Sequence, residues 1–165
     1  KKNLQPKYII NTHSHFDHIE KNKEIKEKYN CMIMLHENEQ YPKEKIDKKL
    51  KHNEIINLDK SQIRVLNTPG HTEGSICISF ENKEHKYLIT GDTLFVNTIG
   101  RMDFEEGDKS AMYDSLYNKI LRLDENTIIL PGHDYGLMPM DTLKDQRKSN
   151  PFLKCKSKEE FIKKF

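Results

Sequence analysis

Short runs of apolar residues recur along the whole chain, and charged or glycine-containing segments separate them. Runs of this kind, bounded by turn-forming residues, predict β-strands. The expected strands cover residues 8–11, 31–35, 55–58, 63–66, 75–80, 87–90 and 127–130. Residues 75–80 alternate between apolar and polar, and residues 87–90 follow closely, so we expect these two segments to pair as a hairpin.

Other segments carry apolar residues at helical spacing among lysine and glutamate, and these predict helices. The expected helices cover residues 18–29, 38–51, 109–123 with Asp108 as the N-cap, 142–149, and the amphipathic tail 157–165. The lysines of 43–51 are expected to form a solvated helix face, and residues 93–108 a long loop. Strands that alternate with helices indicate the α/β class, and the hairpin means that the sheet is not wholly parallel.

The composition limits what the chain can be. Its 165 residues correspond to a single domain. Hydrophobic residues make up 35% and charged residues 33%, so we expect a thin core or one that residues outside this chain complete. Apolar runs fall short of the roughly 18 residues that a membrane span needs. The formal net charge of +2 is far from that of a strongly basic nucleic-acid binder.

The cysteine pattern and the N-terminus bear on the compartment. Cys31, Cys77 and Cys155 are an odd number without a CxxC pair, so we expect free thiols in a reducing compartment. Cys31 and Cys77 lie in apolar strands and are expected in the core, whereas Cys155 lies in a lysine-rich tail and is expected at the surface. The first residues lack the apolar region of a signal peptide, which favours a cytoplasmic location. An organelle stays an alternative, because the natural N-terminus is expected to be missing.

Histidine and aspartate follow directly after several of the expected strands. The segment from Thr12 to His18 contains a dense HxHxDH cluster, and TPGHT, TGDTLF and LPGHDY each add one residue. The candidate ligands are His13, His15, Asp17, His18, His71, Asp92 and His133. Because ligands of α/β proteins gather at the carboxyl ends of strands, we expect these side chains to converge on one point.

This residue set predicts a metal centre. In an extended segment residues i and i+2 point the same way, so His13 and His15 can hold one ion, while Asp17 and His18 point to a neighbouring position. Imidazole and carboxylate ligands suit Zn, Fe, Mn or Co, and the lack of thiolate argues against a closed structural zinc site. Seven ligands suit two divalent ions, with Asp92 placed to bridge them. The remaining histidines in charged segments are expected at the surface: His36, His52 and His85.

The segments THSHFDH, TPGHT, TGDTLF, GRMDF, LPGHDY and NPFL resemble, in order and spacing, the metallo-β-lactamase fold superfamily. The glyoxalase II-like group and the related persulfide dioxygenases are the most similar. The resemblance implies an αβ/βα sandwich, with a first metal on His13, His15 and His71. It implies a second metal on Asp17, His18 and His133, bridged to the first by Asp92.

Specific positions separate the chain from other members. Diiron flavoproteins resemble the pattern but place glutamate where His15 stands, and true β-lactamases typically place cysteine where Asp92 stands. The family normally has a β-rich stretch before HxHxDH, whereas here the motif begins at Thr12, so we expect the fold to lack its N-terminal portion. We also expect the chain to lack the helical C-terminal domain that contacts glutathione in glyoxalase II.

The resemblance implies a binuclear metallohydrolase of an activated acyl bond, most simply a thioester such as a hydroxyacylglutathione. Metal ions lower the pKa of a bound water toward about 7, and the resulting hydroxide attacks the carbonyl. A thiolate with a pKa near 8.5 then leaves without a general acid. Asp17 is expected to orient the hydroxide and Asp92 to bridge the ions. Arg101 and Asp103 are expected to support the site, and Tyr135 to line the pocket.

Two alternatives stay open. A mononuclear iron persulfide dioxygenase would hold Fe(II) with His13, His71 and Asp92 and leave positions for oxygen and substrate. The chain as given would otherwise be an inactive fragment of a larger enzyme. The expected partner is a small thioester or glutathione-type molecule rather than a nucleic acid or a membrane, and an oligomer stays open.

Overall fold

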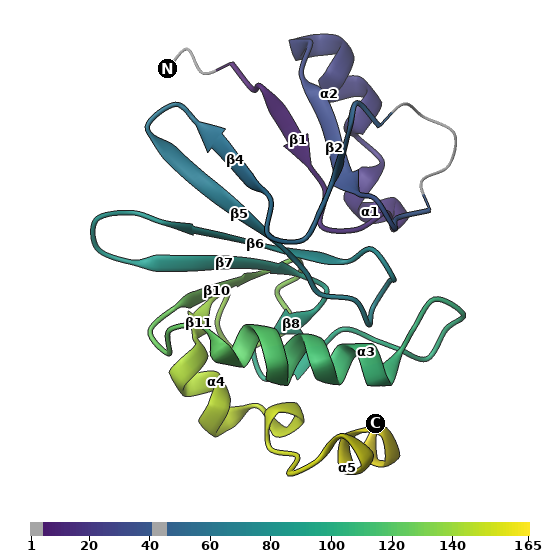
Figure 1. The fold of residues 1–165 in the computed structure, drawn as a ribbon, viewed down its shortest axis with the longest axis vertical. Coiled ribbons are helices and arrows are strands. Elements are labelled where there is room, and N and C mark those ends of the chain that lie inside the picture. The colour runs from purple at the N-terminus through teal and green to yellow at the C-terminus, as the bar shows by residue number, and fades with distance from the viewer. Residues whose placement is uncertain (1–4, 41–45) are drawn as a thin grey trace.

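In the described part of the chain, two main β-sheets lie between two layers of helices (Figure 1). The computed structural model describes residues 5–40 and 46–165. The smaller sheet is parallel and has the order β1 (Tyr8–Ile10), β2 (Met32–His36) and β3 (Lys48–Leu50). This arrangement confirms the predicted α/β class and the sandwich architecture.

The larger sheet contains six strands. Their order is β11 (Asp141–Thr142), β10 (Ile128–Pro131), β7 (Lys86–Gly91), β6 (Ile76–Glu81), β5 (Ser61–Asn67) and β4 (Ile55–Leu58). β6 and β7 form the predicted hairpin, with Phe80 opposite Tyr87. β10 is parallel to β7, while the other neighbours are antiparallel. The sheet is therefore mixed, as predicted.

Helices cover the outer sides of both sheets (Figure 1). α1 (Phe16–Ile19) and α2 (Asn22–Tyr29) lie beside the small sheet. On the opposite side of the large sheet lie α3 (Lys109–Tyr113), which continues through η1 (Asp114–Lys119) and η2 (Ile120–Arg122), then α4 (Leu143–Ser149), η3 (Pro151–Leu153) and α5 (Lys158–Lys164). Asp108 caps α3 as predicted, because its carboxylate accepts a hydrogen bond from the Ala111 amide.

The large sheet is buried on both faces, and successive residues of β6 show why. Ile76 and Ile78 pack with Met34 and other residues in a cluster between the two sheets. Cys77 points the opposite way, into a second cluster formed with the helices. Burial of apolar area on both faces holds the strand ends in fixed positions, and those ends carry the candidate site.

One predicted element is wrong. The helix expected over 38–51 does not form in its described part: residues 48–50 are strand β3, and residues 41–45 lie outside the described residues. Leu50 is fully buried between the sheets, which explains the strand. Lys48 and Lys49 are exposed to solvent, as predicted, although they lie in a strand rather than in a helix.

Smaller corrections concern boundaries and burial. The expected helix 18–29 is two helices, and the predicted loop 93–108 contains the short hairpin of β8 (Leu94–Phe95) and β9 (Thr98–Ile99). His36 is buried at the end of β2, where its Nδ1 accepts from the Asn38 amide. Cys155 is buried too, because its amide donates to the Tyr117 hydroxyl and draws the segment onto the helices. Cys31 and Cys77 are buried as predicted.

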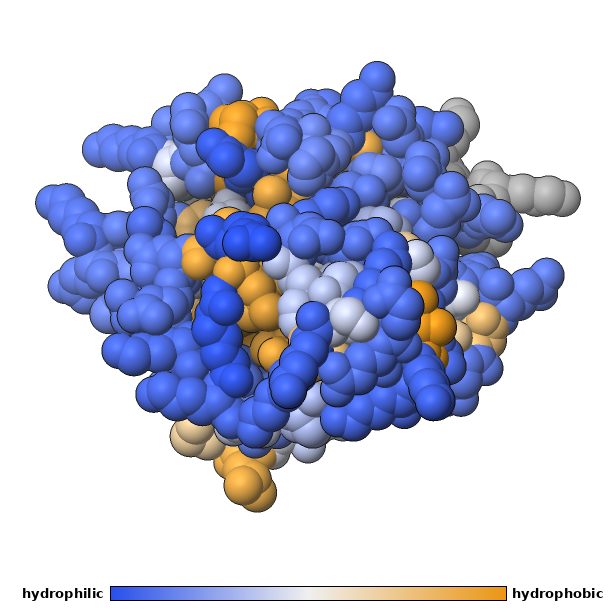
Figure 2. Space-filling view, turned by 60° about the horizontal axis from the view of Figure 1, so that its bottom comes forward, coloured by the Kyte–Doolittle hydropathy of each residue, from blue (hydrophilic) through white to orange (hydrophobic). Residues whose placement is uncertain are grey.

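The surface reflects the high share of charged residues. Hydrophilic side chains cover most of the face seen in Figure 2, and a few apolar patches interrupt them. Within the described residues, none of the helices combines the length and the apolar character that crossing a bilayer requires.

Candidate metal centre

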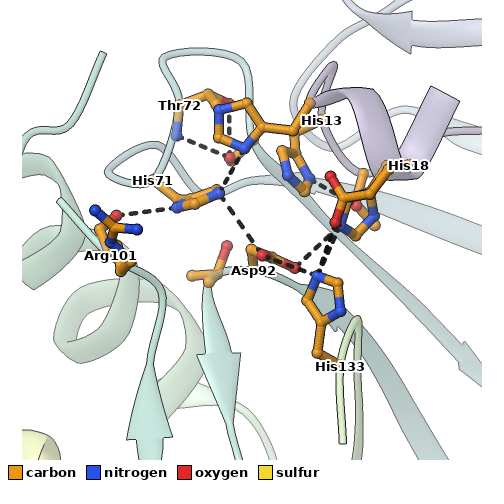
Figure 3. Close-up of polar contacts among 12 residues, drawn as sticks. His13, His18, His71, Thr72, Asp92, Arg101 and His133 are labelled. Atoms are coloured by element: carbon orange, nitrogen blue, oxygen red, sulfur yellow. Dashed lines mark hydrogen bonds and ion pairs between the residues drawn. The ribbon is translucent and has the colours of Figure 1, made fainter. Parts of the chain in front are cut away.

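Four strands deliver the candidate ligands to one edge of the fold. β10 is parallel to β7, and β5 runs the same way because both β5 and β7 are antiparallel to β6. Their carboxyl ends therefore lie at the same edge, and His71, Asp92 and His133 follow them (Figure 3). The loop after β1 brings the HxHxDH cluster to this edge from the small sheet.

The HxHxDH segment divides at the start of α1. His15 is the N-cap of α1 and has extended backbone, whereas Asp17 and His18 lie within that helix. The Asn11 carboxamide donates to the His18 carbonyl over 2.7 Å and also bonds Asn22 at the start of α2. Asn11 thereby holds the two short helices that replace the single predicted one.

The first group consists of His13, His15 and His71. Nδ1 of His15 lies 2.9 Å from Nε2 of His71. The His13 ring centre lies 4.7 Å from that of His15 and 4.9 Å from that of His71. One ligand atom from each of the three residues can therefore reach a common point, since all three atoms lie within 4.8 Å of one another.

The second group consists of Asp17, His18 and His133. The Nε2 atoms of His18 and His133 are 3.2 Å apart, and an Asp17 oxygen is 3.2 Å from Nε2 of His133. Asp17 is the most exposed of the three side chains. The second group therefore faces solvent, while the first lies deeper.

Asp92 lies between the two groups. Its Oδ2 is 3.7 Å from Nε2 of His71 and 3.4 Å from Nε2 of His133. Its Oδ1 is 3.3 Å from Nε2 of His18. One carboxylate thus contacts histidines of both groups, which is the position that a bridging ligand needs.

Two buried atoms show that these residues fit a cation. Among the described residues, Nε2 of His13 and Oδ1 of Asp92 are buried without a hydrogen-bond partner. An unsatisfied buried polar group costs about 1–3 kcal/mol. A metal ion bound by neutral imidazole and carboxylate would satisfy both atoms.

The electrostatics of the centre favour the neutral, metal-binding form of His13 and His71 and the ionised form of Asp92. Burial lowers the pKa of His13 to about 2 and also lowers the pKa of His71, so both rings stay neutral. Burial acts to lower the pKa of His18 as well, but the negative charge of the Asp92 carboxylate, 3.3 Å from Nε2 of His18, outweighs it and raises that pKa. Burial likewise acts to raise the pKa of Asp92, yet the neighbouring histidines hold it below its ordinary value. Asp92 is therefore a carboxylate at neutral pH.

Groups around the centre orient its side chains. Nδ1 of His71 donates to the Arg101 carbonyl over 2.9 Å, which leaves Nε2 free to face the centre (Figure 3). A Cβ on Gly132 would lie 2.6 Å from Oδ1 of Asp92 and 3.0 Å from Cε1 of His18. A larger residue at this position of the LPGHDY motif would displace the side chains of Asp92 and His18, a constraint that sequence reasoning did not identify.

The residues predicted to support the site or to line its pocket lie at its edge. The Arg101 guanidinium donates to Asp103 over 2.9 Å, and both side chains are exposed. Tyr135 stacks on His133, with ring centres 5.0 Å apart. Sequence reasoning missed Phe104, whose ring packs at 5.5 Å from that of His15; its place within GRMDF was the only signal.

An open cleft adjoins the first group. It has a volume of about 1030 Å³, and His15 forms part of its wall. Met102 and Phe104 supply apolar lining. The charged lining is mainly acidic: Glu39, Glu73, Glu105, Glu106 and Asp108, with Lys109 as the cation. A small molecule in this cleft can reach the centre from the His15 side.

The chain belongs to the metallo-beta-lactamase superfamily, whose sequence pattern matches residues 1–133. It is 41% identical over 134 residues to the hydroxyacylglutathione hydrolase of Pelagibacter ubique (strain HTCC1062), covering 81% of this chain and 54% of that protein. It is 31% identical over 157 residues to the mitochondrial persulfide dioxygenase ETHE1 of Bos taurus, covering 94% of this chain and 59% of that protein.

A solved structure agrees with these relationships. ETHE1 from Myxococcus xanthus superimposes with a TM-score of 0.82 at 29% identity, covering 98% of this chain and 68% of that one. The predicted kinship with both glyoxalase II-like enzymes and persulfide dioxygenases is confirmed. The chain spans little more than half the length of the two curated relatives named above.

Proposed function

We propose that this protein is a metal-dependent hydrolase that cleaves a thioester, with a hydroxyacylglutathione as the type of substrate. The position of Asp92 carries the proposal. Its carboxylate lies 3.7 Å from His71 of one group and 3.4 Å from His133 of the other. A carboxylate shared between two groups of ligands suits a pair of ions better than a single one. The similarity to hydroxyacylglutathione hydrolases supports the same reaction.

Each group would hold one divalent ion, Zn by preference and Fe or Mn as alternatives. The first ion would take His13, His15 and His71, the second Asp17, His18 and His133, and Asp92 would touch both. Such ions, when bound, lower the pKa of a coordinated water toward about 7 and so supply a nucleophile at neutral pH.

The side chains of the centre have distinct tasks. His13 and His71 stay neutral because burial lowers their pKa, so their lone pairs remain available. Asp17 lies on the solvent side, 3.2 Å from Nε2 of His133. Its carboxylate can accept a hydrogen bond from the attacking water and orient it toward the substrate carbonyl. The thiolate, with an ordinary pKa near 8.5, leaves without a proton donor.

The cleft beside His15 would hold the thiol portion of the substrate. Phe104 packs against the rings of His15 and His71 at 5.5 and 5.2 Å and shields that side of the centre from water. Arg101 and Asp103 neutralise each other at the surface, and their role is to support the loop rather than to bind substrate. The three free, buried thiols suit a reducing compartment such as the cytoplasm.

A second candidate function is an iron persulfide dioxygenase. The similarity to ETHE1 proteins, which extends over 94% of this chain, favours it. In that case a single Fe(II) would take His13, His71 and Asp92, and the acidic side chain of Asp17 would have no ion to bind.

Metal content and two assays distinguish these functions. The protein would be reconstituted with Zn²⁺, Mn²⁺ or Fe²⁺, and bound ions counted by elemental analysis. About two ions per chain, with thiol release from S-lactoylglutathione, supports the hydrolase. One Fe per chain, with oxygen uptake on glutathione persulfide, overturns it in favour of the dioxygenase. Failure to bind metal overturns both for this chain and supports the inactive fragment.

A further inference from the structure

Glu39 is a buried carboxylate that joins the two loops of the first group of histidines. It follows β2, and only 9% of its surface is exposed. Its Oε2 accepts hydrogen bonds from the Ser14 amide, over 2.9 Å, and from the Ser14 hydroxyl. Its Oε1 accepts from the Thr72 hydroxyl. Ser14 stands between His13 and His15, and Thr72 directly follows His71.

The loop of His71 packs closely onto Glu39. The Thr72 amide donates to the Ser75 hydroxyl over 3.1 Å, and the hydroxyls of the same two residues are 2.7 Å apart. A Cβ on Gly74 would lie 2.5 Å from the Glu39 nitrogen. The loop therefore reaches Glu39 only because this position is glycine. Figure 3 shows Thr72 beside His71, on the side away from Asp92.

Both oxygens of Glu39 accept hydrogen bonds from the two loops, at Ser14 and Thr72. Glu39 lies outside the groups of described residues whose ligand atoms come within 4.8 Å of one another. Its effect on an ion would therefore pass through Ser14 and Thr72. Ligand geometry in metal sites has to be held within about 0.5 Å, and supporting hydrogen bonds supply that precision.

We propose that Glu39 is a positioning residue for the metal centre: its one carboxylate sets the separation of the His13–His15 loop from the His71 loop, so that three imidazoles meet at one point. The contact of 2.9 Å between His15 and His71 depends on this separation. The inference rests on the metal centre of the proposed function and does not depend on which substrate is cleaved.

Metal binding by the apo protein tests the role directly. Zn²⁺ affinity would be measured by competition with a chromophoric chelator, and the coordination of Co²⁺ by its visible absorption. For Glu39→Ala we expect the affinity for the more tightly bound ion to fall about 10- to 100-fold, the usual effect of losing a supporting group. The Co²⁺ bands should shift or weaken. Glu39→Gln should lose less of this affinity, because its amide oxygen can still accept a hydrogen bond from Ser14.

Glu73→Ala is the matched control. Glu73 lines the same cleft and follows Thr72, but it is exposed, and it accepts a hydrogen bond from the Asn38 side-chain amide over 3.4 Å. Glu73→Ala removes a charge but keeps the hydrogen bonds of Glu39 to Ser14 and Thr72. Zn²⁺ affinity should therefore stay within about twofold of wild type, as expected for a screened surface charge. Equal losses in Glu39→Ala and Glu73→Ala would overturn the proposal, because charge alone would then explain them.

Two further outcomes separate the possible failures. If Glu39→Ala does not fold, as judged by circular dichroism, Thr72→Val replaces it, since valine keeps the shape of threonine and removes the donor. Wild-type affinity and an unchanged Co²⁺ spectrum in a folded variant would overturn the role of Glu39 alone. A wild-type protein that binds neither ion would overturn the proposed function, and the positioning role with it.

Discussion

The Nε2 atoms of His18 and His133 face each other at 3.2 Å. At most one of two such nitrogens can donate along the contact. The carboxylates of Asp17 and Asp92 both lie within 3.2–3.6 Å of each nitrogen. Two lone-pair donors and two carboxylates that converge in this way are stabilised by a cation between them.

Removal of metal should destabilise the fold. A ligand present at about 100 times its Kd adds about 2.7 kcal/mol to the stability of the native state, which corresponds to roughly 5–10 °C in Tm at this chain length. We therefore expect EDTA to lower the Tm by that amount and added Zn²⁺ to restore it, as followed by calorimetry. An equal Tm with and without EDTA would show that the native state holds no tightly bound ion.

Replacement of Asp92 by Ala should remove ions from the centre. The carboxylate contacts His71 in one group and both histidines of the other, so its loss weakens both positions. We expect elemental analysis to show about one ion or fewer per chain where the wild type holds about two, as in two-metal sites. Asp103→Asn is the control, since Asp103 pairs with Arg101 at the surface. Retention of both ions in Asp92→Ala would refute the bridging role.

The stability of the apo protein should fall in mild acid. Burial lowers the pKa of His13 from 6.5 to about 2 in the folded state. The unfolded chain therefore binds the extra proton first, and the stability that is present above pH 6.5 is lost as pH falls toward 2. His71 acts in the same direction, whereas the raised pKa of His18 opposes it in part.

For His13 alone the loss between pH 7 and pH 5 amounts to about 2 kcal/mol in the free energy of unfolding. Urea unfolding at the two pH values would measure it. His13→Asn should show a smaller loss than wild type, while the exposed His85→Asn should match wild type. A wild-type stability that is flat over this range would contradict the buried, neutral state of His13.

The acidic cleft should favour a positive charge on the thiol portion of the substrate, which in glutathione is the α-ammonium group. Glu73, Glu105 and Glu106 are exposed in the same wall, and clefts of one sign concentrate ligands of the other. We expect kcat/KM to be roughly tenfold higher for an acetyl thioester of thiocholine than for that of 3-mercaptopropionate, with a smaller ratio at high salt. The double variant Glu105→Gln, Glu106→Gln should narrow the ratio. Equal values for the two thioesters in wild type would exclude a role for the cleft charge.

Local patterns identified much of the fold. The strands before His71, Asp92 and His133 were predicted from short apolar runs, because each run is buried on both faces of the large sheet. The helix predicted over 38–51 does not form, because its lysines and glutamates are typical of an exposed helix. Within its described residues, Leu50 is the one apolar side chain that is buried. That burial depends on a parallel partner, β2, and a local pattern contains no information about the partner.

In the candidate site, too, local motifs could be predicted from the sequence, whereas contacts between distant segments could not. The structure brings all seven predicted ligands together, and their role as ligands stays a prediction. Glu39 was not identified, because its partners Ser14 and Thr72 are 25 and 33 positions away and a single glutamate after a strand carries no distinctive pattern. Contacts that close a site across distant loops become visible only when the chain is folded.

The meeting of His18 and His133, 115 positions apart, has a consequence for the order of folding. The two sheets and the strand β10 must all be in place before these nitrogens approach each other, so the centre is among the last features to form. Interactions that are absent from the transition state slow unfolding and leave the folding rate almost unchanged. A bound ion would therefore slow the unfolding of this protein, and it would not serve as a nucleus for its folding.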